Sequence, residues 1–201
     1  MNSDNYYTIE RSGVAEFKDR GSKFIAYVFP ITDAGEFKKR LKELKDEHPK
    51  ATHHCFAYRV GIDGNNFRSS DNGEPSGTAG KPILGQIDSK QLTNVAVIVV
   101  RYFGGKLLGV PGLINAYKTA TALALQTIPV IQKAVEINYR LEFDHTRMNE
   151  VMMIIKKYNC SILKQQAGLF CTMDIGIPKT NLELVILKFR ELQGVESRKI
   201  D

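Results

Sequence analysis

The chain has 201 residues, of which 43% are hydrophobic and 25% charged, a composition typical of globular proteins and sufficient for one large domain or two small ones. No apolar run approaches the roughly 20 residues of a membrane-spanning helix, and the first residues lack the basic and apolar regions of a secretory signal. We therefore expect a cytoplasmic protein with no membrane partner. Three widely spaced cysteines, without a CxxC motif, favour reduced thiols over a disulfide framework or a structural zinc site.

The net charge of +6 is unevenly distributed along the sequence. Residues 1–134 hold 18 Lys and Arg against 13 Asp and Glu, whereas residues 135–201 hold 10 against 9. The first part of the chain is therefore the basic one. This imbalance favours an anionic partner such as RNA without requiring it.

Strand and helix patterns alternate along this basic part. Runs rich in β-branched and aromatic residues predict strands at residues 14–20, 23–30, 53–60, 67–70 and 95–100. The first two runs form a hairpin around Gly21 and Ser22. The 95–100 run has no polar alternation, which predicts a strand that is buried on both faces.

Three helices are expected between and after these strands. Asp33, followed three residues later by Glu36, predicts a capped amphipathic helix that extends to about residue 48. Ser76 or Thr78 is expected to cap the second helix. Pro111 opens the third.

From residue 134 the pattern starts again. The expected elements are a strand at 135–143, a helix at 147–158, a hairpin around Gly168, a helix capped by Thr180 and a strand at 195–200. Their order, βαββαβ, is that of a ferredoxin-like domain. We therefore predict an α+β protein with two domains, residues 1–133 and 134–201.

Two glycine-rich, polar loops flank the 95–100 strand. The first loop covers residues 71–82 and reads DNGEPSGTAGKP, with two carboxylates, two hydroxyls and a lysine. The second loop covers residues 101–112 and reads RYFGGKLLGVPG, with four glycines, an arginine and a lysine. A hydrophobic core needs neither so many glycines nor so many charges. We interpret the pair as a ligand-binding surface in preference to simple tight turns.

Both loops lead into predicted helices, where free backbone N–H groups and the helix dipole attract anions. Lys81, Arg101 and Lys106 lie beside these helix starts, so the surface is a candidate for binding phosphate groups. The loops do not form a nucleotide-binding P-loop, because the GxxxxGK[ST] spacing is missing and Leu107 follows Lys106. No cofactor is expected.

Asp71 and Glu74 allow two interpretations. They are candidates for metal binding or acid–base chemistry, with Glu74 as the candidate general base. The alternative, which we favour, is that Asp71 orders its turn while Glu74 pairs with Arg101. His53 and His54 begin a strand and point to opposite faces, so at most one of them faces the loops and no metal site is expected.

Together, the two loop motifs resemble those of the IMPACT family, in particular its bacterial YigZ-like members, over nearly the whole chain. The resemblance implies an N-terminal domain similar to the second domain of a small-subunit ribosomal protein and to domain IV of the translocating elongation factor. It also implies a ferredoxin-like C-terminal domain similar to domain V of that factor. Eukaryotic family members regulate translation initiation with a further N-terminal domain that we do not find here, so that role is not expected to transfer.

The resemblance also implies which residues form the functional surface. Carried over by position, and joined by Lys106 from the charge pattern, they are His53 or His54 (we choose His54), Asp71, Glu74, Ser76, Thr78, Lys81, Arg101, Gly104, Gly105, Lys106 and Gly109. Asn72 departs from a common aspartate, which weakens a two-carboxylate metal site. Val110 and Pro111 replace a common Thr-Gly pair, which removes a hydroxyl and an N–H from the second loop and weakens its grip on phosphate.

Three hypotheses for function follow. The leading one is a non-enzymatic protein that associates with RNA or the ribosome and is linked to the regulation of translation. The second is a small enzyme for a phosphorylated or nucleotide-like metabolite, with Glu74 as general base and Arg101 as electrostatic stabiliser. The third is a protein-interaction module that uses the sheet face of the C-terminal domain. The oligomeric state cannot be read from the sequence.

Overall fold

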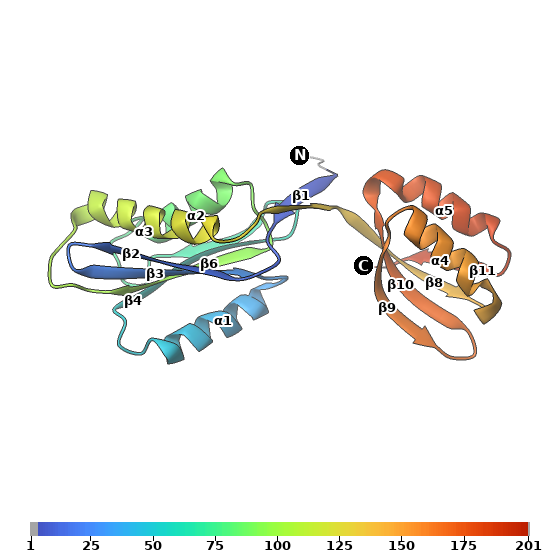
Figure 1. Ribbon diagram of the computed structural model, residues 1–201, viewed down its shortest axis with the longest axis horizontal. Helices are drawn as coiled ribbons and strands as arrows, with labels where there is room; N and C mark the ends of the chain where they lie inside the picture. The colour runs from blue at the N-terminus through green and yellow to red at the C-terminus, as the bar shows by residue number, and fades with distance from the viewer. Residues whose placement is uncertain (1–3, 201) are drawn as a thin grey trace. The chain divides into compact units, whose positions relative to one another are not determined.

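The computed structural model describes residues 4–200, which form two compact units. The N-terminal unit contains residues 6–133, and the C-terminal unit contains residues 134–200 with residues 4 and 5. Near this division, β1 (Asn5–Thr8) and β7 (Ile131–Ala134) pair in a two-stranded sheet. The mixture of helices and mainly antiparallel sheets confirms the predicted α+β class (Figure 1).

The N-terminal unit is built on a five-stranded antiparallel sheet in the order β2-β3-β6-β4-β5. The strands are β2 (Gly13–Asp19), β3 (Ser22–Pro30), β4 (His53–Val60), β5 (Asn66–Ser70) and β6 (Val95–Tyr102). The central strand is β6, whose side chains from Val95 to Val100 are all 0% exposed. The predicted burial of this strand on both faces is confirmed.

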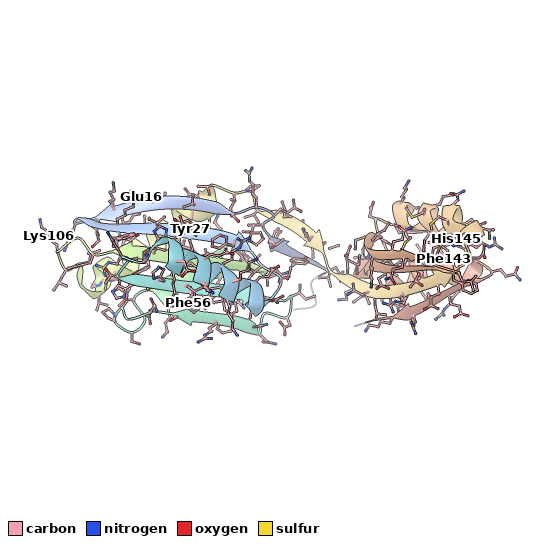
Figure 2. The ribbon with its side chains drawn as sticks, turned by 90° about the horizontal axis from the view of Figure 1, so that it is seen from below. Glu16, Tyr27, Phe56, Lys106, Phe143 and His145 are labelled. Atoms are coloured by element: carbon pink, nitrogen blue, oxygen red, sulfur yellow. The ribbon has the colours of Figure 1, made fainter. Side chains whose placement is uncertain are left out.

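Helices cover both faces of this sheet (Figure 1). On one face, α2 (Gly80–Ser89) and α3 (Gly109–Gln126) pack against alternate β6 residues such as Val97 and Val99. On the other, α1 (Ala34–Glu47) packs against Ile98 and its neighbours. Figure 2 looks onto this second face, where Tyr27 and Phe56 lie. Within residues 4–200, none of the helices is both long and apolar enough to cross a membrane.

The predicted helix caps have mixed outcomes. The Asp33 cap is confirmed, because its Oδ1 accepts hydrogen bonds from the N–H groups of Gly35 and Glu36 at 2.5 and 3.0 Å. The Ser76 or Thr78 cap is wrong. Ala79 is the residue before α2 and makes no side-chain cap, and the Thr78 hydroxyl instead donates to the Pro75 carbonyl at 2.7 Å.

The C-terminal unit has one four-stranded sheet covered on one face by two helices (Figure 1). Its elements are β8 (Glu136–Phe143), α4 (Met148–Lys157), β9 (Ser161–Ala167), β10 (Cys171–Pro178), α5 (Leu182–Glu191) and β11 (Val195–Lys199). This order and the antiparallel arrangement β11-β8-β10-β9 confirm the ferredoxin-like prediction. The predicted Thr180 cap is wrong, because Lys179–Asn181 forms a 3-10 turn before α5 and no side chain caps it.

One glycine of the second loop is required by close packing. A Cβ atom at Gly104 would lie 1.9–2.3 Å from backbone atoms of Gly21 and Ser22. No side chain fits at that distance, so the glycine lets the second loop rest directly on the β2–β3 turn. At this position the packing explanation for the loop's glycines holds.

We expect Gly104→Ala to destabilise the N-terminal unit by about 1–3 kcal/mol, because the new methyl group overpacks against fixed backbone. Gly85→Ala is the matched control, because Gly85 lies on α2 and a Cβ atom there would have no neighbouring atom within 4 Å. There we expect a gain of about 0.5–1 kcal/mol from the lower backbone entropy of alanine. Urea unfolding measures both, and equal effects at the two positions would contradict the packing argument.

Candidate functional site

The strand register brings four loops to one end of the five-stranded sheet. Lys23 of β3 pairs with Tyr102 of β6, and His53 of β4 pairs with Arg101. Four segments therefore meet at this end of the sheet: the β2–β3 turn, the segment before β4, the first loop and the second loop. We call the surface formed by residues 20–21, 48–52, 71–79 and 103–108 the loop end. The two predicted loops share it.

A buried ion pair lies beneath the loop end. Arg101 Nη1 donates to Glu74 Oε1 at 2.6 Å, and the two side chains are only 6% and 3% exposed. The Tyr117 hydroxyl donates to the same oxygen at 2.7 Å. His53 Nε2 lies 3.8 Å away, too far for a hydrogen bond. This confirms the interpretation that Glu74 pairs with Arg101.

Neighbouring groups hold the pair in place. Arg101 Nη2 donates to Ser22 Oγ at 3.3 Å, and the guanidinium lies 5.3 and 5.6 Å from the ring centres of Phe24 and Phe103. Such aromatic contacts suit the weakly hydrated guanidinium of arginine. Arg101 Nε is buried and has no hydrogen-bond partner.

The phenol and thiol next to the pair are neutral. Burial raises the pKa of Tyr117 far above its ordinary value and raises the pKa of Cys55 to about 12. Cys55 Sγ lies 2.8 Å from the Asp71 carbonyl oxygen and 3.3 Å from the Tyr117 oxygen, so it is a hydrogen-bonded core thiol. A buried thiol with a raised pKa is a poor nucleophile.

Asp71 orders the first loop and provides the cap that α2 lacks. Its Oδ1 accepts from the N–H groups of Ala79 and Gly80 at 2.9 and 2.8 Å, and its Oδ2 accepts from Gly77 at 2.8 Å. Burial pushes the pKa of Asp71 upward, but the three backbone N–H groups outweigh it and hold the pKa below its ordinary value. The turn-ordering role expected of Asp71 is confirmed.

A cavity of about 340 Å³ opens between the two loops above the ion pair. Its apolar walls come from Pro75, Phe103, Leu107, Leu108, Val110 and Leu113. Thr52, His53, Glu74 and Arg101 form its polar end. Apolar walls with a few polar groups at one end are the usual composition of a small-molecule site.

The predicted site residues do not all lie together. Glu74 and Arg101 line the cavity, and Gly109 lines it where α3 begins. The choice of His54 as a site residue is corrected. His53 lines the cavity, whereas the His54 ring lies on the face of the sheet that α1 covers. Only its backbone N–H reaches the first loop, donating to Asn72 Oδ1 at 2.8 Å. Its buried ring has Nε2 unpartnered, and burial lowers its pKa.

The remaining predicted residues lie around the cavity or within the loops. Lys81 and Ser76 are exposed, and Thr78 is buried in its loop. Gly104 packs on the β2–β3 turn and Gly105 has the positive φ of a tight turn. Figure 2 shows Lys106 at the outer end of the second loop, directed away from the sheet. The only predicted cation in contact with the buried carboxylate is thus Arg101, among the residues that the structure describes.

Sequence reasoning missed several residues of the site. Nothing in the local sequence distinguishes Tyr117 from an ordinary core residue of α3, because its hydroxyl contact with Glu74 spans 43 residues. Ser22 was assigned to a turn, yet it accepts from Arg101 and from the Gly104 N–H at 3.2 Å. The apolar residues Leu107, Val110 and Leu113 carry no chemical motif. A usable signal existed only for His53, as one of the two strand histidines.

Comparison with known proteins adds a family. The model of the Impact N-terminal domain matches residues 20–125. An IMPACT family member of Haemophilus influenzae is 34% identical over 180 residues, which cover 88% of this chain and 87% of that protein. The IMPACT family member YigZ of Escherichia coli is 30% identical over 159 residues, 78% of each chain. A crystal structure of a hypothetical protein superposes with a TM-score of 0.75 at 25% identity, covering 99% of this chain and 98% of that one.

We expect Glu74→Gln to lower the free energy of unfolding by about 3–5 kcal/mol, because it leaves the Arg101 charge buried without a counter-ion. Glu43→Gln is the control, since Glu43 pairs with Arg40 at 3.0 Å on the surface, where both side chains are nearly half exposed. That change should have little effect. Urea unfolding compares the two, and similar midpoints for both variants would overturn the assignment of Glu74 as the essential counter-ion.

We expect Asp71→Asn to cost about 1 kcal/mol at pH 7, because the amide cannot accept from all three N–H groups of this partly exposed site. Because the pKa of Asp71 is lower in the folded state, its ionised carboxylate stabilises the fold at pH values above the ordinary pKa of 3.8. This stabilisation is lost as the pH falls through the folded-state pKa. The difference between wild type and variant should therefore shrink below about pH 4. Ser76→Ala, in the same loop, is the control and should leave stability unchanged at every pH. An Asp71→Asn effect that stays constant from pH 7 to pH 2 would contradict this account.

Proposed function

The chain belongs to the IMPACT family, and on that basis we propose that it is a cytoplasmic protein that associates with RNA or the ribosome and takes part in regulating translation. The proposal keeps the predicted domains, residues 1–133 and 134–201, and places the RNA contact on the first. The family supports the link to translation, and the loop end supports the link to RNA.

The charge of the loop end is the observation that carries this proposal. Its exposed cations are Arg20, Lys50 and Lys106, one from each of three different segments. Its two carboxylates are already used, since Glu74 is paired with Arg101 and Asp71 accepts three backbone N–H groups. Three exposed cations therefore outweigh one partly buried carboxylate, that of Asp71, and the net positive charge suits a phosphate backbone.

An exposed aromatic ring favours a nucleic acid over a simple anion. Phe103 is 47% exposed at the rim of the cavity, next to the segment that carries Lys106. Cationic side chains that contact phosphates, together with an aromatic ring that stacks on a base, are typical of proteins that bind single-stranded RNA. Phe103 and Lys106 provide this combination within four residues.

The enzyme hypothesis receives less support from the same geometry. Glu74 Oε1 is held by Arg101 and Tyr117, so the carboxylate serves as the counter-ion of a buried charge. A general base needs to gain and lose a proton during turnover. Glu74 could do so only by breaking the pair that neutralises Arg101.

We expect the Arg20→Ala/Lys106→Ala double variant to bind RNA more weakly and with a lower salt dependence. The slope of log K against log salt should fall by about 1.4 if two single-strand phosphate contacts are lost. Fluorescence anisotropy with a labelled single-stranded RNA at several salt concentrations measures this slope. Cosedimentation with ribosomes measures association in the native context.

The matched control is Lys38→Ala/Lys39→Ala, which removes the same charge from the exposed first half of α1. Its slope should stay at the wild-type value. Equal losses of RNA affinity in the two double variants would show that only net charge matters. That result would contradict the assignment of the loop end as the RNA-binding surface. Ribosome association that survives nuclease treatment and the loop substitutions would favour a protein contact instead.

A further inference from the structure

The cavity between the loops is electrostatically balanced at its polar end. The positive Arg101 and the negative Glu74 lie in contact at 2.6 Å, and both are almost fully buried. A phosphate or carboxylate inside the cavity would add a charge with no counter-ion, at a large desolvation cost. The cavity therefore suits a neutral ligand, and phosphate groups belong outside it, on the exposed cations of the loop end.

The polar end still has unused hydrogen-bonding capacity. Within residues 4–200, Arg101 and Tyr117 both donate to Glu74 Oε1, and nothing donates to Oε2. His53 Nδ1 lies 2.8 Å from the Asn72 carbonyl oxygen, so in the neutral ring Nδ1 carries the proton and Nε2 is an acceptor. The buried Nε of Arg101 is a donor without a partner. Two acceptors are therefore left for a ligand, whereas the buried Arg101 Nε is not accessible to it.

The walls of the cavity define the rest of the ligand. Leu108 and Leu113 are buried, whereas Phe103 and Leu107 are 47% and 84% exposed at the opening. Apolar walls favour a flat, weakly polar body, and an aromatic ring at the opening favours a stacking partner. A nucleobase has this shape, and an amino group on its edge supplies the N–H donors that two acceptors need.

We propose that this cavity receives one unstacked base of a bound RNA, with a preference for the amino-bearing bases adenine, cytosine and guanine over uracil. This inference rests on the proposed RNA association. The backbone phosphates of the same strand contact Arg20 and Lys106 elsewhere on the loop end. The base enters beside Phe103 and directs its amino edge toward Glu74 and His53.

The test compares a short single-stranded RNA with an abasic ribose-phosphate chain of the same length, each labelled for fluorescence anisotropy. The wild-type protein should bind the RNA about 10-fold more tightly, as expected for one stacked base. Val110→Phe, which fills the cavity, should remove this advantage, whereas Ile114→Phe, on the same helix but outside the cavity, should keep it. Arg20→Ala/Lys106→Ala should weaken both ligands equally.

The possible failures are distinguishable. If the abasic chain binds as tightly as the RNA while the arginine and lysine substitutions still weaken both, RNA association stands and the base site is overturned. If neither chain binds, RNA association itself fails. A base advantage that persists in Val110→Phe would also overturn the assignment of the cavity.

A second measurement tests the cavity without RNA. The chain contains no tryptophan, so Leu107→Trp places the only tryptophan of the variant at the opening, where it can be excited selectively over the tyrosines. Adenosine, cytidine and guanosine should change its emission at lower concentration than uridine, and ribose 5-phosphate should not change it. A response to ribose 5-phosphate equal to that for the nucleosides would overturn the preference for a neutral base.

Discussion

The contact between Arg101 and Glu74 is the interaction on which the site depends. It joins the end of the central strand to the first loop, and through Tyr117 and Ser22 it also engages α3 and β3. Such a pair is costly to bury and adds little net stability over an apolar core. Because four segments supply its contacts, we expect the pair to act by fixing their relative positions and not by adding net stability.

The same pair separates two chemical roles that the sequence places close together. Because the buried arginine is neutralised, the positive charge available to a partner lies on the exposed Arg20, Lys50 and Lys106. The interior beside the pair is then neutral and largely apolar. A long anionic ligand with flat, uncharged side groups would match both regions at once, with its charge outside and one side group inside.

The sequence predicted the elements whose signals are local. The apolar 95–100 run, the Asp33 cap and the βαββαβ order depend on neighbouring residues, and each is confirmed. The Glu74–Arg101 pair was also predictable, because an arginine that leaves a buried strand needs a carboxylate. The cap of α2 was not predictable, because Asp71 precedes the two residues whose N–H groups donate to it by eight and nine positions. The choice between His53 and His54 required strand register, which tertiary pairing sets.

The contact between Gly104 and Gly21 has a consequence for access to the cavity. It fastens the second loop to the β2–β3 turn at one end, and α3 fastens it at the other from Gly109. Only residues 105–108 remain between these two attachments, a span of roughly 13 Å when fully extended. We therefore do not expect this loop to swing aside as a lid. The proposed base would enter past the exposed Leu107 side chain without a slow opening of the loop.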